Sequence, residues 1–261
     1  MVLSLTIAGI ICLLIAHSFT WHPNGGEDYY IKKPLWFAHR GSLLSSPENS
    51  IPSYLDAQKK GVPAIEMDVV STKDGVVVCS HNFDLERKTS ARGYIHQMNY
   101  MDLVKNLKSE KENIPTLETA LDSIKDPVRI NVEIKTSKIF DIKTALSVAK
   151  TIRRKNLIDR VMISSFNPFS LWAVKWIQKS ILTGFIVEKR YMTPLIHFSR
   201  ADFIHPDSRL VTPKLMTFAK KRKMKINVWT VNTKPAIDWL IKQGVDGIIT
   251  DRLEFYTGKN N

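Results

Sequence analysis

The feature that most constrains the fold of this chain is a regular alternation of short apolar runs with longer amphipathic stretches, which begins at Leu35. Such an order is typical of a parallel sheet whose strands are joined by crossover helices. The pattern predicts nine strands, one more than the eight of an α/β barrel, and we assign the surplus strand to a hairpin. The predicted strands are Leu35–His39, Ala64–Val70, Val76–His81, Arg129–Ile134, Val161–Ser165, Leu182–Val187, Ala201–His205, Ile226–Val231 and Gly247–Thr250.

Two of the predicted helices have clear start and stop signals. Ser50 can cap a helix that has Pro52 in its first turn and Gly61 just past its end. Pro235 begins a second helix, which Gly244 closes. Both helices end where the next strand begins, as expected of repeated strand–helix units.

Outside this alternation the chain has three further parts. The stretch from 83 to 115 is polar and too long for an ordinary barrel connection, so it predicts a small insertion near the mouth of the barrel. Residues 22–34 form a polar linker, and residues 35–257 form the main domain. Residues 1–21 precede the linker.

The segment from Val2 to Trp21 contains no Asp, Glu, Lys or Arg, and a helix needs about 20 apolar residues to cross a bilayer. It is either a retained anchor or a cleaved signal peptide, with Ala16 and Ser18 as a possible cleavage site. We favour a single-pass anchor over residues 1–21, because a signal peptide normally has a basic start that is missing here. A buried core helix is a third alternative, although such helices are usually shorter or amphipathic. The following charges lie too far away to indicate the side of the membrane.

Composition points to an anionic partner. The formal net charge is +13 and the sequence pI about 9.7, which suits a phospholipid surface, a phosphate ester or a nucleic acid. No recognised fold or stacking pattern supports nucleic acid. The basic runs 153–155 and 220–223 are either solvated helix ends or contacts to anionic lipid. The two cysteines, Cys12 and Cys79, indicate neither a disulfide framework nor a zinc site.

A pair of acidic residues lies within the second predicted strand. Alternation places Glu66 and Asp68 on one face of the strand and Met67 on the other. Two neighbouring carboxylates repel each other unless a cation joins them, and Mg²⁺ or Ca²⁺ prefers such oxygen ligands. The alternative is a solvated strand face.

A hairpin follows the acidic pair. Asp74-Gly75 is the signal for a two-residue type I′ turn, and pairing Lys73 with Val76 places Asp68 opposite His81. The imidazole then lies on the same face as the carboxylates. A bulge at the turn would instead shift the register by one residue and turn His81 away.

Further candidates lie at the ends of two other strands. The first strand ends in His39-Arg40-Gly41, and the Arg40 guanidinium offers a planar set of donors suited to phosphate oxygens. The fourth predicted strand carries Glu133 and Lys135 on one face, as a third carboxylate and a phosphate-binding cation or as a local ion pair.

Several motifs, read together, are more specific than any one alone. They are His39-Arg40-Gly41, Pro47-Glu48-Asn49-Ser50, Glu66-x-Asp68, Asp74-Gly75, His81, Glu133-x-Lys135, Trp229-Thr230-Val231-Asn232 and Gly244-Val245-Asp246-Gly247-Ile248-Ile249-Thr250-Asp251. In this order and spacing the chain resembles the glycerophosphodiester phosphodiesterase family. The resemblance implies an α/β fold, a TIM barrel of the phospholipase-C-like phosphodiesterase type. It also implies a divalent cation, Mg²⁺ or Ca²⁺, at Glu66, Asp68 and Glu133.

The resemblance further implies an activity. His39 and His81 act as general acid and base, and Arg40 and Lys135 bind the phosphate. The substrate is a glycerophosphodiester, cleaved to glycerol 3-phosphate and an alcohol, or a lysophospholipid, cleaved to lysophosphatidic acid in the lysophospholipase D sense. Trp229 either lines the substrate pocket or packs in the core.

One position departs from the family pattern. Asn82 follows His81 where the family commonly has Asp, so a hydrogen-bond acceptor is kept but a charge is lost. The competing interpretation of the whole chain is a non-catalytic, membrane-tethered module that binds anionic lipids through its basic surface.

Overall fold

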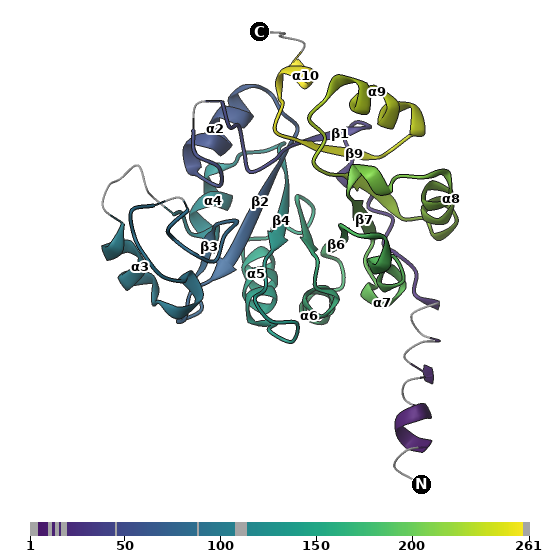
Figure 1. Ribbon diagram of the computed structural model, residues 1–261, viewed down its shortest axis with the longest axis horizontal. Coiled ribbons are helices and arrows are strands. Elements are labelled where there is room, and N and C mark those ends of the chain that lie inside the picture. Colours follow the sequence, from purple (N-terminus) through teal and green to yellow (C-terminus); the bar gives the residue numbers. More distant parts are fainter. Residues whose placement is uncertain are drawn as a thin grey trace.

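The computed structural model describes residues 5–9, 12–13, 16, 20–44, 46–87, 89–107 and 114–257. Eight parallel strands close into a barrel with helices around it, so the predicted TIM barrel is confirmed (Figure 1). Strand β1 pairs with β9 on one side and with β2 on the other, which joins the two ends of the sheet. The barrel strands are β1 (Leu35–Ala38), β2 (Ala64–Ser71), β4 (Arg129–Ile134), β5 (Val161–Ser165), β6 (Leu182–Val187), β7 (Phe203–Pro206), β8 (Lys225–Val228) and β9 (Gly247–Thr250).

Helices connect the strands along the outside of the barrel. The two helices with clear sequence signals form as predicted: the Ser50 hydroxyl accepts the N–H of Ser53, and Gly244 closes its helix with φ 77°. Since the strands are parallel, the connecting helices run from the carboxyl end of the barrel to its amino end. They are α2 (Ile51–Lys59), α4 (Leu117–Ser123), α5 (Lys143–Arg154), α6 (Pro168–Ile177), α7 (Leu195–Ser199), α8 (Pro213–Arg222) and α9 (Lys234–Gln243), followed by α10 (Glu254–Thr257).

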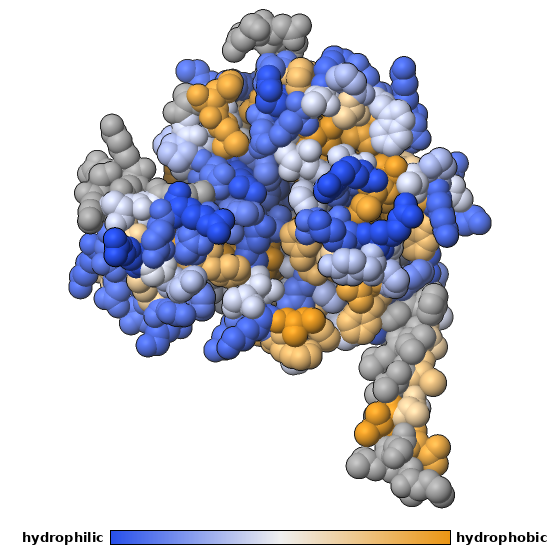
Figure 2. Space-filling model, viewed as in Figure 1, coloured by the Kyte–Doolittle hydropathy of each residue, from blue (hydrophilic) through white to orange (hydrophobic). Residues whose placement is uncertain are grey.

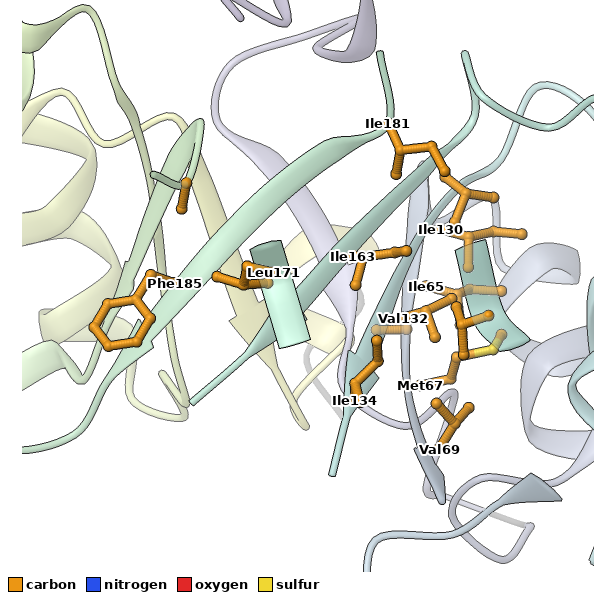
Figure 3. Packing of buried hydrophobic residues seen from close by; sticks show 14 of the residues in the cluster. Ile65, Met67, Val69, Ile130, Val132, Ile134, Ile163, Leu171, Ile181 and Phe185 are labelled. Atoms are coloured by element: carbon orange, nitrogen blue, oxygen red, sulfur yellow. The ribbon is translucent and has the colours of Figure 1, made fainter. Parts of the chain in front are cut away.

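Strand β2 shows how alternation separates the hydrophobic core from the barrel interior. Ile65, Met67 and Val69 are fully buried in the layer between the barrel and its helices (Figure 3). Glu66 and Asp68, which lie between them, therefore face the interior of the barrel. Each buried apolar side chain contributes roughly 1.5–3 kcal/mol. A one-residue slip of this strand would lose that contribution and place carboxylates in the core, so the register is strongly fixed.

The hairpin after β2 differs from the prediction. Strand β3 (Val77–Cys79) pairs Val77 with Ser71 of β2, and one step further the Thr72 N–H donates to the carbonyl of Val76 (2.9 Å). The loop between Thr72 and Val76 therefore has three residues, and the predicted two-residue type I′ turn is wrong. The Thr72 hydroxyl accepts the N–H of Val76 and donates to the Asp74 carboxylate, which stabilises the longer loop. Gly75 has φ 87°, as expected of the left-handed residue in a three-residue hairpin loop.

The insertion packs against this hairpin. It contains the 3₁₀ turn η2 (Ile95–Gln97) and the helix α3 (Tyr100–Asn106). Leu85, Ile95 and Leu103 are buried there against Val70 and Val78 of the hairpin, as a small core of their own. The insertion is therefore an outgrowth of the hairpin.

Residues 22–34, the predicted linker, close the amino end of the barrel. Tyr29 and Tyr30 are buried among side chains from the first residues of several strands. The Tyr29 hydroxyl donates to the carbonyl of Ile130 (2.9 Å), and the Tyr30 hydroxyl donates to Oδ1 of Asn227 (2.8 Å). This segment thus fixes the start of the chain to the barrel.

The predicted anchor, residues 1–21, lies partly outside the described residues. Those of its residues that are described before Trp21 are helical. Within the described part of the chain, no helix is both long and apolar enough to cross a membrane.

Candidate active site

Three carboxylates meet at the carboxyl end of the barrel. Glu66 and Asp68 project inward from β2, and Glu133 projects from β4, where the register pairs it with Asp68. One oxygen from each carboxylate lies within 4.8 Å of the others. Hydrophilic side chains line the hollow at the middle of the visible face, beside β2 and β4 (Figure 2). The structure thus brings together the three residues predicted as metal ligands.

The chemistry of this acidic triad fits a hard divalent cation. Glu66 and Asp68 are 2% and 1% exposed, and buried charges are costly unless they are paired. Oε1 of Glu66 has no hydrogen-bond partner among the described residues, and Oδ1 of Asp68 and Oε1 of Glu133 contact only the Lys135 ammonium. Burial raises the pKa of Glu66 well above its usual value, and the neighbouring Asp68 and Glu133 carboxylates raise it further. A divalent cation bound between the three carboxylates would favour their charged forms and so lower the pKa of Glu66 again.

Lys135 supplies positive charge beside the triad. Its Nζ lies 3.2 Å from Oδ1 of Asp68 and also contacts the Glu133 carboxylate. Burial opposes its charge, but the two carboxylates raise the pKa of Lys135 above its usual value. Burial likewise opposes the charge of Asp68, but Lys135 and Arg40 hold the pKa of that carboxyl below its usual value. Asp68 is therefore ionised, and Lys135 is a permanent cation facing the site.

Arg40 is held in place by acidic residues. Its backbone adopts φ 57°, and its N–H donates to Oε2 of Glu66 (3.0 Å). Nη1 donates to both carboxylate oxygens of Glu48 (3.0 Å each), and Nε lies 3.1 Å from Oδ2 of Asp68. The residue after Arg40 must be a glycine, because a Cβ at position 41 would lie 2.3 Å from the hydroxyl of Ser53. The predicted phosphate-binding arginine thus lies at the triad with its orientation fixed.

His39 lies at the edge of the triad. Its Nε2 is 4.0 Å from Oε2 of Glu66, and its Nδ1 is 2.6 Å from Oδ1 of Asp251. The other Asp251 oxygen accepts from Nδ2 of Asn232 (2.6 Å). Burial opposes the charge of Asp251, but the bond with His39 and further contacts hold the pKa of that carboxyl below its usual value. Asp251 therefore orients the imidazole.

His81 reaches the site by a different route from the one predicted. In the observed register Asp68 is level with Ser80, whose N–H donates to the Asp68 carbonyl (3.0 Å). Strand β3 has already ended at Cys79, so strand alternation does not govern where His81 points. Burial lowers the pKa of His81, whereas the Asp68 carboxylate raises it. Because Ser80 is bonded to Asp68, His81 follows directly beside the acidic pair, although the predicted register is wrong.

The residue after His81 fixes its tautomer. Oδ1 of Asn82 lies 3.0 Å from Nδ1 of His81. An amide oxygen can only accept, so Nδ1 carries the proton and Nε2 is left as the reactive nitrogen. Asn82 thus supplies orientation without charge.

Trp229 both lines the site and packs. It is half-buried, its Nε1 donates to the carbonyl of His205 (2.7 Å), and its ring contacts Phe166 edge-on at 5.7 Å. With His39 and Glu66 it lines a small polar cavity of about 20 Å³ in the barrel interior. The ring thus packs in the barrel interior next to the triad, and its contact with substrate stays a prediction.

Sequence reasoning left four site residues without a role. Asn49 holds Asp68 from both sides, since its Nδ2 donates to Oδ2 and its Oδ1 accepts the Asp68 N–H (2.9 Å each). Glu48 holds Arg40, Asp251 holds His39, and Asn232 holds Asp251. Asn49, Glu48, Asn232 and Asp251 all stood in the quoted motifs. All four lie in segments that follow a barrel strand, where a closed barrel gathers its functional residues, and this position could have identified them.

Comparison with known proteins identifies relatives of this site and fold. The model of the glycerophosphoryl diester phosphodiesterase family matches residues 39–255. A glycerophosphodiester phosphodiesterase of Caldanaerobacter subterraneus subsp. tengcongensis is 33% identical over 229 residues, covering 84% of this chain and 94% of that protein. The structure of an Oleispira antarctica phosphodiesterase in complex with the product sn-glycerol-3-phosphate has a TM-score of 0.73 and 25% identity, covering 84% and 93% of the two chains. A glycerophosphodiester phosphodiesterase from Parabacteroides distasonis has a TM-score of 0.74 and 26% identity, covering 85% and 94%.

Proposed function

The chain belongs to the glycerophosphoryl diester phosphodiesterase family, a family of phosphoric diester hydrolases, and from this premise we propose that it cleaves glycerophosphodiesters to glycerol 3-phosphate and an alcohol. The observation that carries the proposal is the convergence of Glu66, Asp68 and Glu133, with His39 next to Glu66 and with His81 directly after Ser80, which is bonded to Asp68. Such a set of groups provides a cation site and proton transfer at one place.

The triad would hold the divalent cation, Mg²⁺ or Ca²⁺. A cation held by these three carboxylates would supply polarisation of a phosphoryl oxygen and would offset the charge that develops there. Lys135 and Arg40 add fixed positive charge on the same side. Because Glu48 and Asp68 already orient Arg40, little reorganisation is needed when the phosphate arrives.

His39 and His81 transfer protons. One imidazole takes a proton from the attacking oxygen, and the other gives a proton to the alcohol oxygen as its bond to phosphorus breaks. The attacking oxygen belongs either to water or to a neighbouring glycerol hydroxyl, the latter by way of a cyclic phosphate. Asp251 and Asn82 keep Nδ1 of each histidine engaged, which leaves each Nε2 for the substrate.

Soluble glycerophosphodiesters are the substrates that the geometry favours. An apolar groove of about 620 Å³ that includes Ile196 could hold an acyl chain. However, Val187 and Pro206 line this groove, whereas Ile186 and His205, their neighbours in sequence, line the interior cavity below the triad. The barrel wall thus separates the groove from the site. A lysophospholipid, cleaved in the lysophospholipase D sense, is the second substrate to test.

We also propose that residues 1–21 are a membrane anchor. The support is the absence of charged residues from Val2 to Trp21, together with a length that suits a bilayer. The competing proposal, a module that binds lipid without catalysis, does not explain why three carboxylates and two oriented histidines converge.

A single assay tests the proposed function. The purified full chain is incubated with glycerophosphocholine or lysophosphatidylcholine, after chelation and after added Mg²⁺ or Ca²⁺, and released choline is measured. We expect choline release only with added cation, and more from glycerophosphocholine. His39→Ala and His81→Ala should each lower turnover on the order of 10²-fold or more. Full activity after exhaustive chelation would refute the metal, and no release from either substrate would support the binding module.

A further inference from the structure

The amino end of the barrel, opposite the active site, gathers exposed basic residues. Helices α5 and α8 both end there, so the basic runs 153–155 and 220–223 lie on the same face. Lys179, Lys220, Lys221 and Lys242 are exposed, and no acidic side chain in the described part of the chain forms an ion pair with them. These four lysines, from the ends of three helices, define what we call the basic face.

The N-terminal segment leaves the barrel at this face. Nη2 of Arg222, at the end of α8, donates to the carbonyl of Trp21 (2.6 Å), and Nζ of Lys175 lies 5.7 Å from the Trp21 ring centre. Asn24 is tied to α6 and β7 through the carbonyl of Lys179 (2.9 Å) and Oδ1 of Asp202 (2.8 Å). The end of the apolar stretch is therefore fixed beside the basic lysines. Leu5, Ile7 and Leu13 of that stretch are exposed hydrophobic residues, and the stretch extends away from the barrel (Figure 2).

Exposed apolar side chains accompany the lysines. Trp176, in the last turn of α6, is 81% exposed and follows the lysine that contacts Trp21. Ile31, in the segment that closes the barrel, and Ile241, in the last turn of α9, are also exposed. Tryptophan surrounded by lysines is the combination found where proteins meet lipid headgroups, because the ring is amphipathic and lysine is attracted to anionic lipid.

We propose that the basic face docks on the anionic headgroups of a phospholipid bilayer and holds the mouth of the active site away from the membrane. An anchor that begins at Trp21 places the bilayer next to this face. Helix α8, with ten residues, spans about 15 Å from the active-site rim to the basic face. That exceeds the Debye length of about 8 Å at physiological salt, so the rim lies beyond most of the surface attraction.

The inference rests on the proposed anchor but not on the proposed chemistry. It specifies that the site is supplied with substrate from the aqueous phase rather than from the bilayer underneath. This agrees with the separation of the apolar groove from the triad.

Energy transfer to labelled lipid headgroups tests the orientation. The full chain with Cys12→Ser is labelled through Lys242→Cys on the basic face or through Lys138→Cys beyond β4 at the rim, since Cys79 is buried. Each protein is reconstituted into phosphatidylcholine bilayers with or without phosphatidylglycerol. We expect stronger transfer from position 242 than from position 138, rising with phosphatidylglycerol and falling with salt. Equal transfer from both positions, or no response to phosphatidylglycerol, would overturn the proposal.

Charge reversal supplies the matched control. The triple variant Lys179→Glu, Lys220→Glu, Lys221→Glu should lose the response to phosphatidylglycerol at position 242. A control triple at other exposed positions, Lys105→Glu, Lys143→Glu, Lys214→Glu, should keep it. Glycerophosphocholine turnover is measured in the same samples and should be unchanged in the basic-face triple. If the basic-face triple loses the lipid response and keeps normal turnover, docking is supported. If its lipid response is unaltered, docking is contradicted. If no sample, including the unmodified chain, shows turnover, only the proposed chemistry is contradicted.

Discussion

Nδ1 of His39 lies 2.6 Å from Oδ1 of Asp251, although 212 residues separate the two in sequence. The contact exists because the barrel closes: Ala38 of β1 is level with Thr250 of β9, so the residues that follow the two strands emerge side by side. A barrel that failed to close at this seam would leave the His39 imidazole without its carboxylate. Closure of the fold and orientation of the proposed catalytic histidine are thus one event.

Asp251→Asn should slow turnover while leaving the fold intact. The amide keeps the shape of the carboxylate, and its oxygen can still accept from Nδ2 of Asn232. Its NH₂ group then faces Nδ1 of His39 as a donor and favours the wrong tautomer of that imidazole. We expect kcat to fall about 10–100-fold with little change in KM, as for partners that orient functional imidazoles. Steady-state kinetics on glycerophosphocholine measures this, with Asp238→Asn in α9 as the control. A normal kcat would show that His39 is positioned without Asp251.

Asn82→Asp should move the part of the pH–rate profile that depends on His81 to higher pH. In the native protein burial holds the pKa of His81 below its usual value, and the neutral Asn82 amide does little to oppose this. A carboxylate at the same distance would favour the imidazolium and raise the pKa, by roughly one unit. The profile of kcat/KM against pH records the shift, whether His81 is the acid or the base. An unmoved profile would remove His81 from the rate-determining proton transfer.

Added Mg²⁺ or Ca²⁺ should raise the melting temperature of the native protein but not that of Glu133→Gln. A ligand that binds only the folded state at about 100 times its Kd stabilises it by about 2.7 kcal/mol. Without cation the variant should be at least as stable as the native chain. Burial, followed by the nearby Asp68 carboxylate, raises the pKa of Glu133 and makes its charged form costly. The neutral amide of the variant removes the free-energy cost of that buried charge. Thermal denaturation with and without cation checks both statements. Glu118→Gln in α4 is the control, and an equal shift in Glu133→Gln would exclude Glu133 as a ligand.

Much of the barrel could be predicted because its pattern is local. The strands and the capped ends of α2 and α9 follow from alternation and from single residues such as Ser50 and Gly244. The register of the hairpin could not be predicted from the local pattern. The N–H of Val76 bonds to the Thr72 hydroxyl in place of a backbone carbonyl, and the loop is one residue longer than predicted. His81 still lies beside the acidic pair, because Ser80, the residue before it, is bonded to Asp68. The role of Asp251 was missed for a different reason, because it exists only once the two ends of the sheet have met.

A buried histidine below the triad predicts how stability depends on pH. His205 is 1% exposed, its ring would overlap a Cβ at Gly184, and its Nε2 is 3.0 Å from Nδ2 of Asn227. Burial lowers the pKa of His205 to about 3. The folded protein therefore keeps this imidazole neutral, while the unfolded chain takes up a proton below its ordinary pKa of about 6.5. Between these two values the unfolded state binds more protons, so the stability is complete above pH 6.5 and is lost as the pH falls.

Replacing that histidine isolates its contribution. Between pH 6.5 and pH 5 the native protein should lose about 2 kcal/mol of unfolding free energy through His205, which for a chain of this length is a fall in melting temperature of about 4–8 °C. In His205→Gln the amide oxygen can still accept from Asn227 but cannot be protonated in this range, so that part of the fall should disappear. Melting curves of the two proteins, measured in parallel from pH 8 to pH 5, give the difference directly. Curves that fall by equal amounts would mean that His205 becomes protonated inside the folded barrel, and the closed, water-poor interior described for it would be wrong.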